Sequence, residues 1–250
     1  MDKAPHLIIH TLSDLDFELI EAYKKISPRY SSLKKKPWKD FQRYLESIKK
    51  RFSLPTEGIL LDIGSGNARN LLLFESQNWQ HIASDISFEL LDSRVILENN
   101  TVYPLNNNAN SIPLKERSVD LSLCIATIHH FRNEDEVLLV LRNISKILKQ
   151  EGFLILSCWK KWKKGTRKKI VSDFLLYFFK KSKNRLWRHG DIYLPWYNEK
   201  KELIAERYYH LFGKKELLRI VSATNYTVID FAKLGGRGGK DNFFLLLKND

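Results

Sequence analysis

Two glycines and several acidic and amide side chains follow apolar runs at spacings that suit a nucleoside-like ligand. The run Ile59 to Ile63 leads into Gly64-Ser-Gly-Asn-Ala-Arg69, and Asp62 precedes that turn. Glycines allow a sharp turn and let a ligand approach the main chain, and an acid about 20 residues further on can bind ribose hydroxyls. Asp85 occupies that second position, and Asn108 ends the next expected strand, where a side chain can reach an adenine edge. The candidate cofactor-binding residues are Asp62, Gly64, Ser65, Gly66, Asp85, Ile86, Asn108, Ala109 and Ile125.

The same glycine pattern is compatible with two alternatives. The loop could be a tight strand-to-helix turn with an acid downstream by chance. It could also hold the pyrophosphate of a dinucleotide, but such folds normally carry a third glycine before the first helix, and Asn67 to Asn70 contains none. The loop, Asp85 and Asn108 occur in the expected order, and this combination favours a cofactor site over a bare turn.

Histidine and arginine side chains further along the chain are candidates for the reaction itself. His129 and His130 follow the apolar run Val119 to Ile125, and residues at the carboxyl end of a sheet strand face the ligand crevice. The alternative is that the two histidines only cap the junction between strand and helix. Arg207 and His210 are residue types that are rarely buried without a partner, which favours a role in a site.

The elements that must position these residues alternate between strands and helices. Near-continuous apolar runs predict strands that are buried on both faces of a mainly parallel sheet. Helical spacing is clearest over Glu134 to Lys149, where one apolar stripe repeats every three or four residues. This alternation predicts an α/β fold with a doubly wound sheet and right-handed crossovers. The clearest strand runs are Gly58 to Ile63, His81 to Asp85, Val119 to Ile125 and Gly152 to Cys158.

The two ends of the chain are expected to cover and complete this sheet. Leu15 to Arg51 has a helical pattern, with breaks around Ser27-Pro28 and Lys36-Pro37. A C-terminal helix, Lys214 to Ala223, precedes two further strands, Tyr226 to Ala232 and Asn242 to Lys248. We therefore predict a mostly parallel seven-stranded sheet. The expected division is a helical cap over 1–52 and a main domain over 53–250, with a basic insertion at about 159–206.

Basic residues are concentrated in that insertion. The chain has 42 Lys and Arg against 29 Asp and Glu, a net charge of +13, and the stretch Trp159 to Arg188 has Asp173 as its only acid. Tryptophans are interleaved with the cations, and Ile170 to Phe179 has the pattern of an amphipathic helix. Basic side chains can follow phosphates while aromatic rings stack on unpaired bases, so the segment favours RNA. A solvated basic surface and a helix on an anionic membrane are the alternatives.

The cysteines and the hydropathy pattern exclude several classes of protein. Cys124 and Cys158 are the only cysteines, and both fall in apolar runs, which argues against a disulfide framework and a cysteine metal site. No apolar run approaches the roughly 20 residues of a membrane span, and the first ten residues lack a signal-peptide pattern. We expect a cytoplasmic protein with no metal and no membrane partner.

Five segments resemble known methyltransferases. Leu61-Asp-Ile-Gly-Ser-Gly-Asn67 resembles motif I of the class I methyltransferases, where this Rossmann-like loop holds the methionine part of S-adenosylmethionine (SAM). Four others resemble one family, the tRNA methyltransferases that esterify a carboxymethyl group on the wobble uridine (U34), including the eukaryotic catalytic subunit and the methyltransferase domain of the AlkB-like tRNA hydroxylase. These four are Tyr23 to Ser32 with Lys36-Pro-Trp38, Ala126 to Phe131, Asp191 to Trp196, and Arg207-Tyr-Tyr-His-Leu-Phe212.

The resemblance implies an activity, a cofactor and partners. It implies a SAM-dependent enzyme that acts on tRNA together with a small zinc-containing activator protein, for which Val102 and Tyr103 are a possible exposed edge. A carboxylate acceptor is already ionised, so the site needs groups that hold an anion and not a general base. The candidate catalytic residues are Arg29, His129, Arg207 and His210. This sequence departs from the family at Asn108, usually Asp, at Lys34, often Arg, and at Phe243, where the family has Trp.

Two other functions are compatible with the same fold. A small-molecule methyltransferase, acting on a quinone or lipid precursor, would leave the basic insertion unexplained. A non-catalytic RNA-binding subunit would be expected to have lost its cofactor loop, yet Asp62, Gly64, Gly66 and Asp85 are all present.

Overall fold

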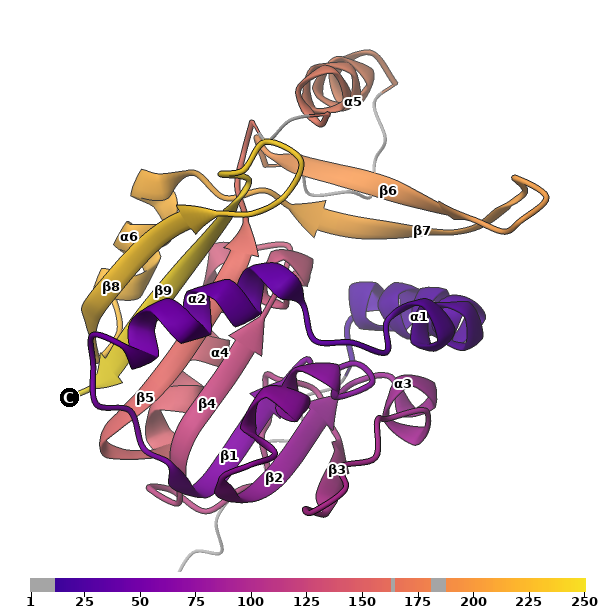
Figure 1. The fold of residues 1–250 in the computed structure, drawn as a ribbon. Helices are drawn as coiled ribbons and strands as arrows, with labels where there is room; N and C mark the ends of the chain where they lie inside the picture. Colours follow the sequence, from indigo (N-terminus) through magenta and orange to yellow (C-terminus); the bar gives the residue numbers. More distant parts are fainter. Residues whose placement is uncertain (1–11, 163–164, 181–187) are drawn as a thin grey trace, which may run out of the picture.

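The computed structural model describes residues 12–162, 165–180 and 188–250, and its centre is a seven-stranded sheet in the order β3-β2-β1-β4-β5-β9-β8 (Figure 1). The first five strands in that order run parallel, and β9 is antiparallel to both of its neighbours. This arrangement confirms the predicted doubly wound sheet. The strands are β1 Glu57–Ile63, β2 Asn78–Asp85, β3 Val102–Asn106, β4 Val119–Ile125, β5 Leu148–Trp159, β8 Tyr226–Leu234 and β9 Asn242–Asn249.

Helices cover both faces of the sheet because alternate strand residues reach two separate apolar layers. Leu61 and Ile63 pack in the layer that contains α4 and α6, whereas Leu60 packs in the layer that contains α2 and η1. The helices are α1 Asp14–Leu33, α2 Lys39–Lys49, α3 Phe88–Asp92, α4 Glu134–Ile147, α5 Arg167–Lys180 and α6 Lys214–Ser222, with short 3₁₀ helices η1 Arg69–Phe74 and η2 Ile128–His130. Along the described chain, no helix combines the length and the apolar character needed to cross a membrane.

The break predicted at Ser27-Pro28 is wrong, because α1 continues through Pro28 to Leu33. Proline lacks the N–H that would bond to the carbonyl of Lys24. The Ser27 hydroxyl donates to that carbonyl oxygen at 3.3 Å and so replaces the missing donor. The second predicted break is confirmed, since the chain leaves helix between Leu33 and Lys39.

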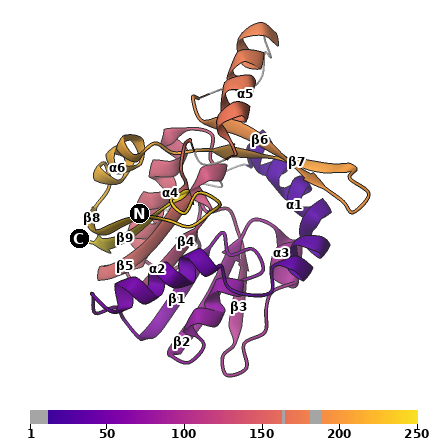
Figure 2. The same cartoon turned by 45° about the horizontal axis from the view of Figure 1, so that its top comes forward.

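The basic insertion is only partly helical. Its described helix is α5, which projects from the body of the molecule (Figure 2). A second described part is an antiparallel hairpin of β6 Asp191–Tyr197 and β7 Leu203–His210. Leu15 and Leu19 of α1 pack on Tyr193 and Tyr208 of this hairpin. The insertion therefore brings β7 against the N-terminal helix and close to the sheet, while the predicted division into domains remains a prediction.

Candidate active site

A cavity of about 380 Å³ lies where the carboxyl ends of β1, β2 and β4 meet α1 and β7. This is the edge at which open α/β sheets bind their ligands. Ten of the thirteen residues predicted for the site line the cavity, and three do not. The ten are Gly64, Ser65, Gly66, Asp85, Ile86, Asn108, Ala109, Ile125, His129 and Arg207.

The glycine loop after β1 is shaped by close contacts that side chains would prevent. Gly64 has a φ of +64°, and a Cβ on it would lie 2.3 Å from the side chain of Thr127. Gly66 also has a positive φ of +57°, but a Cβ there would come no closer than 3.8 Å to its described neighbours. The loop is thus closed on the Thr127 side, and space remains open beside Gly66.

Asp85 fixes this loop from the end of β2. Its Oδ2 accepts a hydrogen bond from the backbone N–H of Gly66 at 2.7 Å, and its Oδ1 accepts one from Ser87 at 2.8 Å. Burial raises the pKa of Asp85, and these backbone donors oppose the shift. A carboxylate has about four lone-pair sites, so these two bonds leave acceptor capacity for a hydroxyl donor in the cavity. This geometry fits the predicted contact with a ribose.

Asp62 does not reach the cavity. Its side chain is 1% exposed and lies beneath the loop, and its Oδ2 has no partner among the described residues. Burial, reinforced by the charge of Asp85, raises the pKa of Asp62 to about 8. The expected direct contact with a cofactor is therefore corrected, because Asp62 is buried and does not line the cavity.

Arg207 supplies a buried cation on the opposite wall of the cavity. It is 9% exposed, and its guanidinium carbon lies 4.9 Å from the ring centre of Trp196, 5.4 Å from that of Tyr209 and 5.8 Å from that of Tyr23. Its Nε is unpaired, and no carboxylate in the described part of the chain forms an ion pair with it. A guanidinium that lines a cavity without a carboxylate partner can bind an anion through its N–H groups.

A chain of hydrogen bonds fixes the aromatic wall beside Arg207. Burial lowers the pKa of His130 to about 4, the Arg207 charge adds to the shift, and the backbone of Tyr208 opposes it. The neutral ring donates from Nδ1 to the carbonyl oxygen of Tyr208 at 3.0 Å. Its Nε2 therefore accepts from the Tyr23 hydroxyl at 3.2 Å.

His129 lines the cavity from within the same wall. Its side chain is 1% exposed, and its ring centre lies 5.0 Å from that of Trp159 and 5.1 Å from that of Tyr209. The Trp159 and Tyr209 rings are themselves stacked, 4.6 Å apart at an interplanar angle of 1°. These rings form a stiff apolar surface beside the buried guanidinium.

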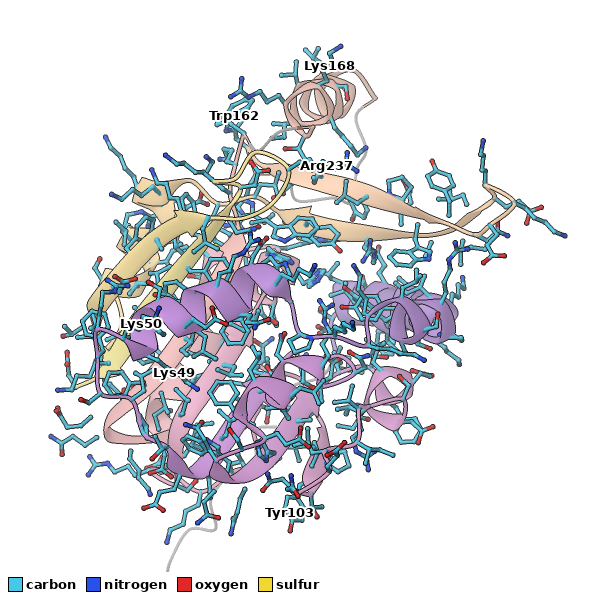
Figure 3. The ribbon with its side chains drawn as sticks, viewed as in Figure 1. Lys49, Lys50, Tyr103, Trp162, Lys168 and Arg237 are labelled. Carbon is cyan, nitrogen blue, oxygen red and sulfur yellow. The ribbon has the colours of Figure 1, made fainter. Side chains whose placement is uncertain are left out.

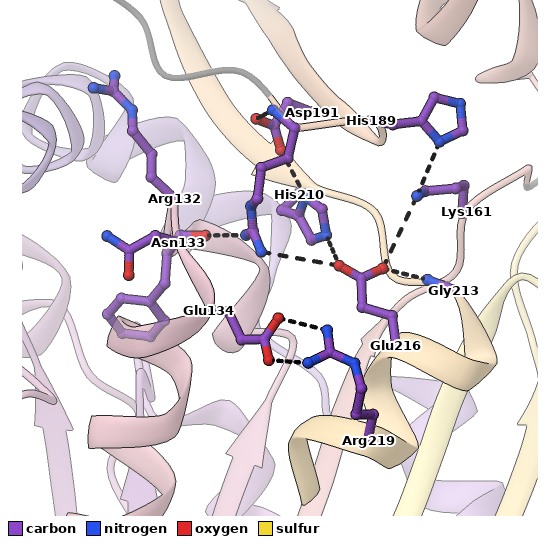
Figure 4. A network of polar contacts seen from close by, with 12 residues as sticks. Arg132, Asn133, Glu134, Lys161, His189, Asp191, His210, Gly213, Glu216 and Arg219 are labelled. Atoms are coloured by element: carbon purple, nitrogen blue, oxygen red, sulfur yellow. Dashed lines mark hydrogen bonds and ion pairs between the residues drawn. The ribbon is translucent and has the colours of Figure 1, made fainter. Parts of the chain in front are cut away.

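His210 and Arg29, two of the predicted catalytic residues, lie outside the cavity. His210 is fully buried between two carboxylates, with Nδ1 2.6 Å from Asp191 Oδ1 and Nε2 2.7 Å from Glu216 Oε1 (Figure 4). Both ring nitrogens are occupied, so the ring cannot also hold a substrate. Arg29 forms an ion pair with Glu199 at 3.7 Å near the end of the hairpin, and its side chain is 38% exposed. The predicted role of His210 is therefore corrected to a structural one, whereas the role of Arg29 stays a prediction.

The three departures from the family fall in different places. Asn108 lines the cavity, and its Oδ1 accepts from the N–H of Asn110 at 3.0 Å. Phe243 is buried in the core against Phe231 and does not line the cavity. Lys34 lines the cavity, where burial and the neighbouring charges of Arg69 and Arg207 lower its pKa.

Other cavity residues were not predicted as site residues. Tyr30 lies on α1 seven residues after Tyr23 and on the same side of the helix. This helical spacing is the feature of the sequence that could have indicated Tyr30 as a site residue. Thr127 follows β4, and Trp159 is the last residue of β5. Their positions at the carboxyl ends of strands could have indicated them as site residues. Asn107 also lines the cavity, but its carboxamide is already used in bonds to Ser84, Asn108 and Ser111.

Comparison with known proteins gives consistent results. A family profile described as a methyltransferase domain matches residues 61–156. The tRNA (carboxymethyluridine(34)-5-O)-methyltransferase of Schizosaccharomyces pombe is 25% identical over 228 residues, which are 84% of this chain and 89% of that protein. The mouse enzyme of the same name, ALKBH8, is 28% identical over 56% of this chain but only 19% of its own length. A SAM-dependent methyltransferase from Methanosarcina mazei has the same fold, with a TM-score of 0.64 and 19% identity over 81% of this chain and 96% of its own.

The sheet order is that of the class I methyltransferase fold, and residues 61–156 match a methyltransferase domain, so the chain resembles SAM-dependent methyltransferases in fold and in its central sequence. The resemblance to the wobble-uridine carboxymethyl methyltransferase family is confirmed by the named relatives, at modest identity.

Proposed function

We propose that this protein transfers the methyl group of SAM to the carboxymethyl group of wobble uridine in tRNA and so forms a methyl ester. The observation that carries the proposal is Arg207, a nearly buried guanidinium on the cavity wall that pairs with no described carboxylate. A carboxylate acceptor would complete this pair. The Schizosaccharomyces pombe relative, which matches along most of both chains, is named for this reaction.

The cavity residues fit SAM. The space beside Gly66 lets a ligand approach the main chain, and Asp85 presents free lone pairs to a ribose diol. Asn108 and Ala109 line the part of the cavity where an adenine would bind in this fold. When bound, SAM supplies a methyl group on a positively charged sulfur.

Arg207 and its neighbours provide what esterification requires. An acceptor carboxylate is ionised at neutral pH, so no side chain has to remove a proton. The planar guanidinium can hold a carboxylate through two parallel hydrogen bonds, which fixes its orientation. The rings of Tyr23, Trp196 and Tyr209 exclude water around this pair and strengthen it.

We also propose that a small zinc-containing activator protein covers the β3 edge of the sheet. β3 is the terminal strand, and large apolar side chains are exposed around it: Tyr103 is 55% exposed, Phe88 of α3 62%, and Ile96 89%. An unpaired strand edge beside exposed apolar groups suits a partner that adds a strand or an apolar face. Figure 3 shows Tyr103 at the opposite end of the molecule from α5.

The test is a methyl-transfer assay with an identified product. The purified chain, with and without the activator of its host, is incubated with methyl-labelled SAM and tRNA, and the labelled nucleoside is identified by mass spectrometry. We expect the methyl ester of 5-carboxymethyluridine and no product from tRNA that lacks the carboxymethyl group. Label on another nucleoside, or on a small molecule only, would refute the proposed reaction.

A further inference from the structure

A second depression lies on the α5 side of the molecule, where the end of β5, the start of α5 and the β8–β9 loop meet (Figure 3). Its volume is about 530 Å³. We refer to it as the α5 notch. The residues that matter for its chemistry are Lys160, Trp162, Arg167, Lys168, Lys240 and Asp241.

The α5 notch carries an excess of positive charge. Four of these side chains are cations, and Asp241 is the one acid among the residues that line it. Its Oδ2 accepts from the N–H of Gly238 at 2.6 Å. Within the described chain, Lys160, Lys168 and Lys240 form no ion pair with any carboxylate. The notch therefore attracts anionic groups.

An aromatic ring stands among these charges. Trp162 is 40% exposed, and its φ of +63° is a left-handed conformation that is costly for a large side chain. Its carbonyl oxygen accepts a hydrogen bond from Arg167 Nε at 3.4 Å, and its ring centre lies 5.5 Å from that of His189. These contacts hold an exposed indole beside the cations of the notch.

The α5 notch lies close to the active-site cavity. Trp159 lines the cavity, and Trp162 lines the notch three residues later. Three residues of chain span at most about 11 Å, so a polymer that leaves the cavity on the Trp159 side reaches the notch within a short distance. A concave site with one ring and several cations suits a single nucleotide, whereas an anionic membrane would be met by a protruding apolar face.

We propose that the α5 notch binds one nucleotide of unpaired RNA near the nucleotide that is methylated. The base stacks on Trp162, and the adjoining phosphates contact Arg167, Lys168 and Lys240. This inference rests on the proposed function in its choice of RNA, but it concerns binding and can be tested apart from methyl transfer.

The experiment measures the affinity of the full chain for a fluorescent, unmodified anticodon stem-loop RNA as a function of salt concentration. Trp162→Ala should weaken binding roughly tenfold with little change in the salt slope, because a stacking contact is lost. Trp162→Phe should recover most of this loss. Lys168→Ala with Lys240→Ala should lower the slope by about 0.7 for each lost phosphate contact. Lys50→Ala, an exposed cation at the end of α2, is the matched control and should change neither quantity.

The outcomes separate this inference from the proposed function. Unchanged affinity and slope in the notch variants, with unchanged melting temperatures, would overturn the inference even if tRNA is methylated. Loss of binding to anionic phospholipid vesicles without loss of RNA binding would also overturn it. If the notch variants lose RNA affinity while wild-type protein methylates no tRNA, the inference stands and the proposed reaction fails.

Discussion

Arg207 faces three aromatic rings inside a cavity and has no acid beside it among the described residues. A buried arginine with a purely structural role normally pairs with a carboxylate. A buried charge that loses its partner costs the folded protein about 3–5 kcal/mol. An acceptor carboxylate that enters the cavity would supply the charge partner that Arg207 lacks among the described residues.

Replacement of Arg207 should therefore separate catalysis from folding. We expect Arg207→Ala to lower tRNA methylation at least a hundredfold, roughly the effect of losing about 3 kcal/mol of charge-assisted hydrogen bonding. Arg207→Lys should keep part of the activity, because the charge remains and the planar fork is lost. SAM affinity by calorimetry and the melting temperature should change little. A parallel loss of all three quantities would show that Arg207 is structural.

Asp85 should be required for cofactor binding. Asp85→Ala removes the acceptor of the Gly66 and Ser87 N–H groups as well as the predicted ribose contact. We expect SAM affinity to fall by about 2–3 kcal/mol, and calorimetric titration measures this directly. Asp92→Ala, an exposed acid at the end of α3, is the control and should bind SAM normally. Wild-type affinity in the Asp85 variant would rule out the ribose assignment.

Residue types and spacing predicted most of the side chains that line the cavity around the glycine loop, but they could not assign hydrogen-bond partners. Gly64, Gly66 and Asp85 were recognisable because a strand-end loop and the next strand end must lie together in a parallel sheet. His210 was misassigned because its two acceptors, Asp191 and Glu216, are brought to it only by the hairpin and by α6. The pairing of Tyr23 with His130, 107 residues apart, was equally invisible in the sequence.

At the scale of elements, the acceptor side of the cavity depends on how the β6–β7 hairpin is held. One face of the hairpin packs on α1 through Tyr193 and Tyr208, and the other packs on Ile170 of α5 through Ile192 and Tyr209. Because both faces are covered, the strands show no alternation of polar and apolar residues, so the sequence did not reveal them. The central strands were predictable since long apolar runs flanked by turn residues are typical of strands buried in a parallel sheet.

Glu216 connects this hairpin to α6 and should make stability depend on acid. Burial alone would raise its pKa, but the hydrogen bond and charge of His210, the N–H of Gly213 and the charge of Lys161 lower it to about 2. A carboxyl group with a lowered folded-state pKa stabilises the protein above its unfolded pKa of about 4.5, and this contribution is lost as the pH falls through about 2.

We therefore expect Glu216→Gln to melt roughly 5 °C below wild type at pH 7 and to lose part of the wild-type acid sensitivity between pH 4.5 and 2. Thermal unfolding followed by circular dichroism at several pH values gives both quantities. Glu206→Gln, an exposed acid of the same hairpin, should behave as wild type. Equal acid sensitivity in the Glu216 variant and wild type would mean that the His210 pair does not stabilise the hairpin.

At the scale of the whole molecule, the cavity lies between two surfaces of different character. The whole chain has a net charge of +13, and around the α5 notch several cations have no described acidic partner. The terminal strand β3 and the neighbouring α3 instead expose Phe88, Ile96 and Tyr103. An RNA on the first surface and a protein on the second would not compete for space, so both can be bound during one reaction.

Changes at the β3 edge should therefore affect the activator and leave the isolated chain intact. The double variant Tyr103→Lys/Ile96→Lys replaces two exposed apolar side chains with cations. These charges oppose both the addition of a partner strand and the burial of this edge in an interface. We expect at least tenfold weaker binding of the activator, measured by calorimetry or co-purification, with an unchanged melting temperature and SAM affinity. Leu203→Lys on the hairpin is a control of similar exposure, 55%, and should bind the activator normally. If the β3 variant binds the activator as wild type does, the partner occupies another face, and the apolar groups exposed around β3 do not form its binding surface.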